Sequence, residues 1–165
     1  MPLPAELTTV ARQAAGLLVA RKERISVAES SAGGLISAAL LTVPGASAYY
    51  LGGCVVYTVV AAKELLERPV MIPADVRGAS APFAEFLSRA VSARLRTDWG
   101  VSETGATGPD GNRYGDPAGH AYVGVAGPGG NVATRNVLTG SADREENMIA
   151  FAVAAISLLV ENLGG

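Results

Sequence analysis

The order of helical and strand-like segments is the feature that most constrains the fold of this chain. Apolar residues recur at helical spacing in some segments and form short continuous runs in others. The pattern predicts helices at residues 5–22, 35–41, 61–67, after the N-cap Ser80, and 143–163, and strands at 25–28, 51–60, 98–103, 119–126 and 131–138. Helices distributed among strands favour a sheet that is covered on both faces.

The segment Gly-Pro-Gly-Gly at 127–130 predicts a hairpin between the last two strands. A hairpin joins antiparallel strands, so the sheet is expected to be mixed rather than purely parallel. The 165 residues, of which 49% are hydrophobic and 17% charged, are enough for one core and exclude a disordered chain. We therefore expect an α/β fold, a single three-layer α/β/α domain with a mixed sheet that spans residues 1–165.

Charge and the scarcity of ligand side chains exclude several classes of function. The formal net charge is −2 and no run of Lys or Arg exists, so direct binding of nucleic acid is not expected. Cys54 and His120 are the only cysteine and histidine, which excludes a Cys- or His-rich metal site. The longest apolar stretch, 149–160, is too short to span a bilayer, and no targeting segment is recognised, so we expect no membrane partner and a cytoplasmic location.

Two glycine-rich loops follow predicted strands, where open α/β sheets bind their ligands. The first is Glu29–Gly34 and the second is Thr104–Gly111. Neither carries the Lys-Ser/Thr ending of a phosphate-binding loop, and no G-x-G-x-x-G fingerprint follows a strand, so neither ATP hydrolysis nor a nicotinamide dinucleotide coenzyme is supported. Each loop alone is as well explained by turn formation, but the two together indicate a ligand site.

A nucleophile in this chain needs a base other than histidine. A serine paired with a desolvated lysine is one solution, which draws attention to Ser30, Ser31 and Lys63. Each residue also has a structural explanation: the serines as helix caps, Lys63 as a solvated surface residue, and Tyr57 as a packed strand residue. The residues by themselves leave these alternatives open.

Four motifs, in this order, occur along almost the whole chain. The segment 28–34 (AESSAGG) is similar to A-E-S-C-T-G-G, 44–48 (PGASA) to P-G-S-S-A, 56–63 to T-Y-S-N-E-A-K, and 104–111 (TGATGPDG) to [ST]-G-I-A-G-P-D-G. Weaker echoes of K-P-V-G and G-D-R follow at 116–119 and 142–144. With these motifs the chain resembles the C-terminal domain of the competence/damage-inducible CinA family, which includes nicotinamide mononucleotide deamidases.

The resemblance implies hydrolysis of the amide of nicotinamide mononucleotide to nicotinate mononucleotide and ammonia, with no metal and no cofactor. It assigns Ser30 as nucleophile, Lys63 as its base and Tyr57 as a neighbour that assists proton transfer. It also implies a homo-oligomer. The implied substrate-binding residues are Ser31, Gly33, Gly34, Ser47, Thr104, Gly105 and Arg144. Among these, the backbone N–H groups of Gly33 and Gly34 are expected to bind the oxyanion.

Several polar positions of the family pattern are altered here. Ser31 and Ala32 replace the C-T pair, Ala46 replaces a serine, and Val59 replaces an asparagine. Loss of supporting polar groups weakens a site without moving it. The alternative function is therefore a diverged, non-catalytic module that binds a nucleotide or a protein partner. A direct role with DNA, which the family name would suggest, is disfavoured by the charge.

Overall fold

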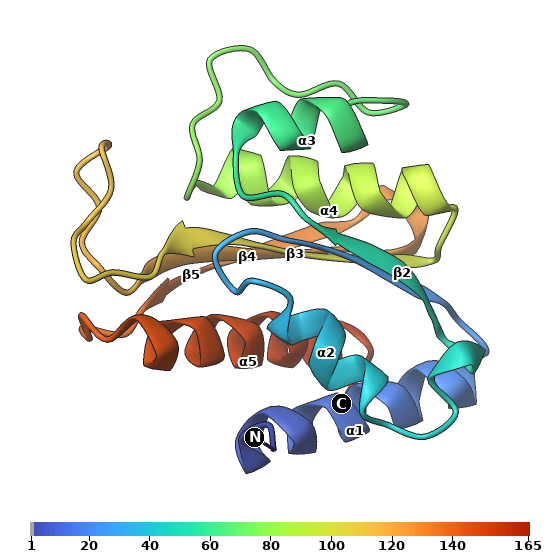
Figure 1. Ribbon diagram of the computed structural model, residues 1–165. Helices are drawn as coiled ribbons and strands as arrows, with labels where there is room; N and C mark the ends of the chain where they lie inside the picture. The colour runs from blue at the N-terminus through green and yellow to red at the C-terminus, as the bar shows by residue number, and fades with distance from the viewer. Residues whose placement is uncertain (1) are drawn as a thin grey trace.

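A five-stranded mixed sheet forms the centre of the protein (Figure 1). The computed structural model describes residues 2–165. The strand order is β2-β1-β3-β4-β5; β1 is parallel to β2 and β3, whereas β3–β4 and β4–β5 are antiparallel. The strands are β1 (Ile25–Glu29), β2 (Tyr50–Val55), β3 (Trp99–Ala106), β4 (His120–Ala126) and β5 (Val132–Leu138). The predicted α/β fold and mixed sheet are thus confirmed.

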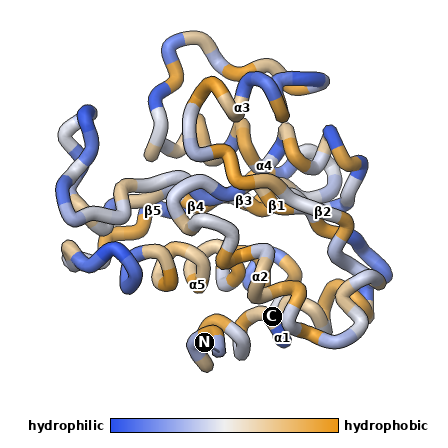
Figure 2. The backbone as a smooth tube through the Cα atoms, viewed as in Figure 1, coloured by the Kyte–Doolittle hydropathy of each residue, from blue (hydrophilic) through white to orange (hydrophobic). Residues whose placement is uncertain are grey.

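Helices cover both faces of this sheet. In Figure 1, α4 lies on one face with α3 above it, and α2 and α5 lie on the other face with α1 beneath them. The helices are α1 (Ala5–Arg21), α2 (Leu35–Leu41), α3 (Val59–Leu66), α4 (Ala81–Leu95) and α5 (Arg144–Asn162). The loop between β3 and β4 projects beyond the sheet and is hydrophilic (Figure 2). Within residues 2–165, no helix is both long enough and apolar enough to cross a bilayer.

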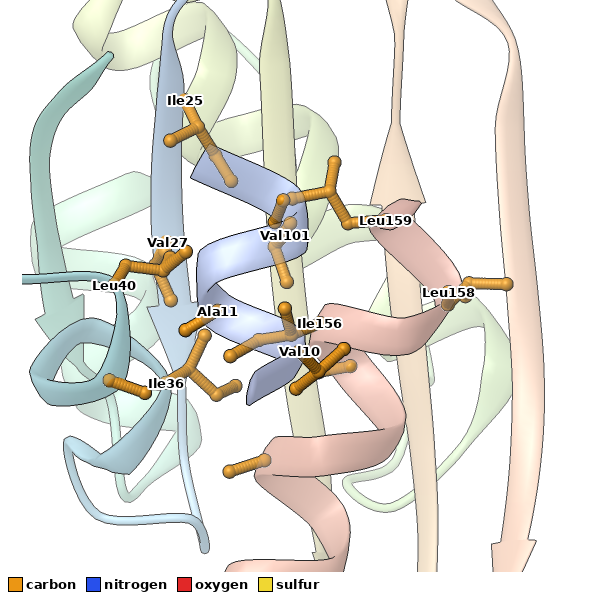
Figure 3. Close-up of a cluster of buried hydrophobic side chains, with 14 of the residues drawn as sticks. Val10, Ala11, Ile25, Val27, Ile36, Leu40, Val101, Ile156, Leu158 and Leu159 are labelled. Atoms are coloured by element: carbon orange, nitrogen blue, oxygen red, sulfur yellow. The ribbon is translucent and has the colours of Figure 1, made fainter. Parts of the chain in front are cut away.

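The larger core lies between the sheet and the α1–α2–α5 side (Figure 3). Val27 and Val101 on neighbouring parallel strands meet Ile156 of α5, and all three side chains are fully buried. Burial of one such side chain stabilises the fold by about 1.5–3 kcal/mol. A smaller core around Phe83 and Leu87 joins α3 and α4 to the opposite face. The two cores hold the strands in place, and the candidate loops emerge at the carboxyl ends of these strands.

For one strand, the structure differs from the sequence prediction in both the residue at which the strand ends and its burial. The apolar and partly β-branched run at 51–60 predicted a buried strand, but β2 ends at Val55 and α3 begins at Val59. Thr58 starts that helix, because its side chain accepts a hydrogen bond from the Ala61 N–H at 3.1 Å. As an edge strand, β2 leaves Leu51 and Val55 exposed. The predicted burial was therefore wrong, since composition does not distinguish an edge strand from a central one.

Two glycine substitutions are expected to change stability in opposite directions. A Cβ at Gly100 of β3 would lie 2.0 Å from the Ser88 carbonyl oxygen of α4, so Gly100→Ala should destabilise the protein by about 1–3 kcal/mol or more. Gly16 of α1 is exposed, with no atom within 4 Å of an added Cβ. Gly16→Ala should stabilise by about 0.5–1 kcal/mol. Urea unfolding of both variants measures the difference, and equal effects would contradict the close helix–strand contact.

Candidate functional site

The loop after β1 is held from the neighbouring strand by Glu103. Its Oε2 accepts hydrogen bonds from the N–H groups of Ser30 at 3.1 Å and Ala32 at 2.7 Å, and its Oε1 accepts one from the Ser31 hydroxyl. The Glu103 side chain is fully buried within β3. Burial raises its pKa to about 7, although the three hydrogen bonds act in the opposite direction and the charge of Glu29 adds to the rise.

Glu29, also fully buried, holds the other end of the same loop. Its Oε2 accepts from the N–H groups of Gly34 at 2.9 Å and Ile36 at 3.1 Å. Its Oε1 accepts from the Ser37 N–H at 3.1 Å and from the Ser37 hydroxyl at 2.7 Å. The carboxylate therefore satisfies the free N–H groups that begin α2 and interacts favourably with the helix dipole.

Gly33 and Gly34 shape this loop and do not offer free N–H groups. The Gly33 N–H donates to the Ser30 carbonyl at 3.2 Å, and the Gly34 N–H donates to Glu29. The expectation that these amides bind an oxyanion is therefore wrong for this conformation, because both donors are occupied. At φ +68° and +104°, the two residues adopt the left-handed backbone that favours glycine, and a Cβ on Gly33 would meet Met148 at 2.8 Å.

A pocket of about 410 Å³ opens beside this loop, at the carboxyl ends of β1, β2 and β3. Of the residues selected from the sequence, Ser30, Tyr57, Thr104 and Gly105 line it together. Within the described chain, no Asp or Glu lines this pocket. Its remaining lining residues come from the β2–α3 connection, the first turns of α3 and α4, the segment before α4, and the β3–β4 loop: Val56, Thr58, Val59, Val60, Gly78, Ala79, Phe83, Asn112, Arg113 and Tyr114.

Two of the pocket hydroxyls are held in different ways. Thr104 is buried, and its Oγ1 accepts a hydrogen bond from the Ala79 N–H at 3.1 Å, which joins β3 to the segment before α4. Ser30 is fixed through its backbone N–H to Glu103, and its hydroxyl makes no intramolecular hydrogen bond within residues 2–165. The Ser30 hydroxyl is therefore available to a ligand in the pocket.

Arg144, at the first position of α5, reaches the rim of the pocket. Its Nη2 donates to the Tyr57 hydroxyl at 3.2 Å, and its Nη1 donates to the Gly108 carbonyl at 2.8 Å. Asp143 caps the helix by accepting from the Glu146 N–H at 2.9 Å. The structure thus brings together Tyr57 and Arg144, which are 87 positions apart in the sequence.

The β3–β4 loop adds a second guanidinium and an aromatic ring to the pocket. Asp116 pairs with Arg77 at 2.5 Å and accepts from the Asn112 amide at 2.8 Å, and the Arg77 hydrogen bond holds the pKa of Asp116 below its usual range. This pairing supports the loop that carries Arg113 and Tyr114, where the Arg113 guanidinium lies 5.0 Å from the Tyr114 ring centroid. In the described chain, Arg113 makes no salt bridge.

Lys63 and Ser47 lie outside this pocket. Lys63 is exposed on α3, in a separate hollow that it shares with Glu64, Glu67 and Arg94. Of the two alternatives for Lys63, the structure therefore shows the solvated surface residue and not the desolvated one. Ser47 lies in a short 3-10 turn before β2, at the opposite end of the parallel strands from Ser30.

The structure also places at the site four residues to which the sequence analysis gave no role. Glu29 ends β1 and Glu103 lies within β3, and an acidic residue in a strand that is buried along its length indicates a carboxylate with specific partners. No comparable signal marks Arg113 and Tyr114, since their place in the pocket depends on the path of the loop.

Comparison with known proteins places the chain in a family. The family profile described as the CinA C-terminal domain matches residues 7–163. A CinA-like protein of Synechococcus elongatus is 36% identical over 126 residues, covering 76% of this chain and 30% of that protein. A CinA-like protein of a Cyanothece strain is 41% identical over 114 residues, covering 69% and 27%. The chain thus spans less than a third of the length of these relatives.

Solved structures agree with the sequence relatives. The competence/damage inducible protein CihA of Agrobacterium tumefaciens superimposes with a TM-score of 0.90 at 28% identity, with both chains covered completely. A CinA superfamily protein of Klebsiella pneumoniae gives a TM-score of 0.88 at 25% identity, covering 96% of this chain and 98% of that one.

Proposed function

The chain belongs to the CinA C-terminal domain family, and from this premise we propose that it hydrolyses the amide of nicotinamide mononucleotide. The products are nicotinate mononucleotide and ammonia, and the reaction serves the salvage of pyridine nucleotides. The proposal concerns the activity of residues 1–165 alone, because the relatives are longer. It requires neither a metal nor a cofactor.

The observation that carries the proposal is the composition of the pocket beside Ser30. Its volume of about 410 Å³ lies in the range of pockets that hold small ligands. Ser30 offers an uncommitted hydroxyl, Phe83 and Tyr114 offer aromatic surface for a planar ring, and Arg113 offers an unpaired cation to a phosphate. A pocket without carboxylates favours an anionic ligand of this kind.

The reaction is an acyl transfer to Ser30. The Ser30 Oγ attacks the carboxamide carbon, its proton passes to a base, and the tetrahedral intermediate collapses as the C–N bond breaks and ammonia leaves with a proton. Water then hydrolyses the resulting ester, which releases nicotinate mononucleotide and restores the Ser30 hydroxyl. In this proposal Tyr57, oriented by Arg144, assists proton transfer at the pocket rim.

Lys63 is the proposed base, although within one chain it does not line the pocket that contains Ser30. In one chain it lies one helical turn beyond Val59 and Val60, which line the pocket, and its side chain is exposed. Ser47 lies at the far end of the sheet. We therefore include a homo-oligomer in the proposal, because a second copy of the chain is the simplest source of groups, such as Lys63 and Ser47, that lie outside the pocket within one chain. Light scattering of the purified protein, and of Ser47→Arg, tests this part.

Arg113 is expected to contribute to affinity through the phosphate. Arg113→Ala should weaken binding of nicotinamide mononucleotide about tenfold, which corresponds to loss of one charge-assisted contact in partly exposed surroundings. Binding of nicotinamide riboside, which lacks the phosphate, should be unchanged. Calorimetric titration measures both ligands, with Arg12→Ala on exposed α1 as the control of equal charge. A loss of equal size for mononucleotide and riboside would contradict the assignment.

A non-catalytic binding module is the second candidate, and the position of Lys63 outside the pocket favours it. If the protein only binds its ligand, nicotinamide mononucleotide raises the melting temperature of the protein by mass action and is not consumed. Ammonia release, measured together with the melting temperature, separates the two candidates. Release that depends on Ser30 supports the hydrolase, and a thermal shift without release supports the binding module.

A further inference from the structure

Glu103 connects β3 to the loop that carries Ser30, and it does so from a fully buried position. Three consecutive residues of that loop, Ser30, Ser31 and Ala32, each donate one hydrogen bond to its carboxyl group. A buried carboxyl group with partners on one segment only acts as a clamp on that segment. The resemblance to the family assigned no role to this residue.

The charged groups around Glu103 do not neutralise it. In the described chain, no Lys, Arg or His nitrogen lies within 4.0 Å of its oxygens. On β1 the neighbouring titratable group is Glu29, which carries the same charge. On β4, His120 contacts the Ala79 carbonyl at 3.0 Å, in the segment before α4, and pairs edge to face with Tyr122. Helix α2 has no titratable side chain, and those in the first turn of α5 are exposed: Arg144, Glu145 and Glu146.

The hydrogen-bond pattern fits both protonation states of the carboxyl group. When ionised, Oε2 accepts the two N–H groups and Oε1 accepts the Ser31 hydroxyl. When protonated, Oε2 still accepts both N–H groups, while the Oε1 hydroxyl donates to Ser31 Oγ. The Ser31 hydrogen is then free to bond elsewhere. A proton exchanged with solvent thus reverses one hydrogen bond without breaking the other two.

We propose that Glu103 is the positioning residue of this site: its carboxyl group fixes the segment Ser30–Ala32 beside the pocket and reverses its hydrogen bond to Ser31 when it gains or loses a proton. The inference extends the proposed function, since it names a residue that controls the loop of the proposed nucleophile. The loop geometry itself does not depend on the reaction.

The primary test follows the loop amides, so it needs no activity. With the pKa of Glu103 at about 7, its protonated fraction falls from about nine tenths at pH 6 to about one tenth at pH 8. The amide resonances of Ser30 and Ala32 in ¹⁵N NMR should shift together over this range. In Glu103→Gln they should not titrate, because the Gln amide donates permanently to Ser31 and reproduces the protonated state.

A second variant keeps the test informative if Glu103→Gln does not fold. Ser31→Ala removes a hydrogen bond that lowers the pKa of Glu103, so the midpoint of the amide titration should move upward. Ser92→Ala on α4, a serine outside the loop, should leave the midpoint unchanged. Amides that do not titrate in the wild type, or a midpoint unaffected by Ser31→Ala, would overturn the proposal.

The activity measurement separates this inference from the proposed function. In the wild type, kcat for ammonia release should follow the same titration, and Glu103→Gln should keep the rate of the low-pH form throughout. Titrating amides without ammonia release would support the role of Glu103 and contradict the hydrolase. Release with a pH profile unchanged by Glu103→Gln would contradict the role of Glu103 and support the hydrolase.

Discussion

Replacing Ser30 with alanine is expected to reduce ammonia release from nicotinamide mononucleotide by about a thousandfold or more. The variant loses the oxygen that forms the acyl intermediate, and no other pocket residue supplies an equivalent nucleophile in this account. The fold should be retained, because the Ser30 backbone N–H, and not its side chain, bonds to Glu103. The rate constant for ammonia release, measured with the circular dichroism spectrum, checks both statements.

Ser157→Ala is the matched control for this loss. Ser157 lies on α5, near the end of the helix opposite to Arg144, and does not line the pocket. Its replacement should leave the rate within about twofold, as is usual for a substitution outside special contacts. A Ser30→Ala variant as active as this control would contradict the assignment of the nucleophile.

Glu29→Gln is expected to destabilise the fold by about 2–4 kcal/mol. Glu29 is the acceptor in all four of its side-chain hydrogen bonds, and three of the donors are backbone N–H groups at the start of α2. A Gln side chain places its own NH₂ group against one pair of these donors, which leaves buried N–H groups without acceptors. The free energy of unfolding in urea measures the effect, with the Gly34 and Ile36 amides expected to lose protection from exchange.

Glu103→Gln is the contrasting substitution at a second buried carboxyl group. Because burial raises the folded-state pKa of Glu103 to about 7 from its usual 4.5, the stability that its protonated form contributes is lost as the pH rises through about 7. Gln does not ionise, so Glu103→Gln should gain stability relative to the wild type between about pH 5 and pH 8. A loss as large as that of Glu29→Gln at pH 8 would contradict the hydrogen-bond assignment.

Much of the fold could be predicted because local pattern and tertiary environment agree. The hairpin at 127–130 and the N-cap Ser80, which accepts from Phe83 N–H at 3.4 Å, are local signals that the structure retains. The run at 51–60 could not be divided correctly, since its β-branched residues lie on both sides of the boundary, at 55–56 and 58–60, and only the Thr58 cap marks the start of α3. The exposed position of β2 depends on strand order, which no local pattern contains.

Most of the predicted residues that line the pocket lie at the carboxyl ends of strands. Ser30, Thr104 and Gly105 follow β1 or end β3, so the topology brings them together. Ser47 was selected by motif alone, and motif order does not determine which end of a strand a residue occupies. Lys63 was selected as a possible base for a serine, and residue type does not determine which way a side chain on α3 points. Glu103 was missed because its importance comes from three hydrogen bonds with residues about 70 positions earlier.

The most direct test of the proposed hydrolase is to follow nicotinamide mononucleotide with the purified protein by NMR and to assay ammonia in the same sample. We expect conversion to nicotinate mononucleotide with one ammonia released for each molecule consumed. Nicotinamide mononucleotide that remains intact at a protein concentration sufficient to bind it would contradict the hydrolase function and leave the pocket as a binding site.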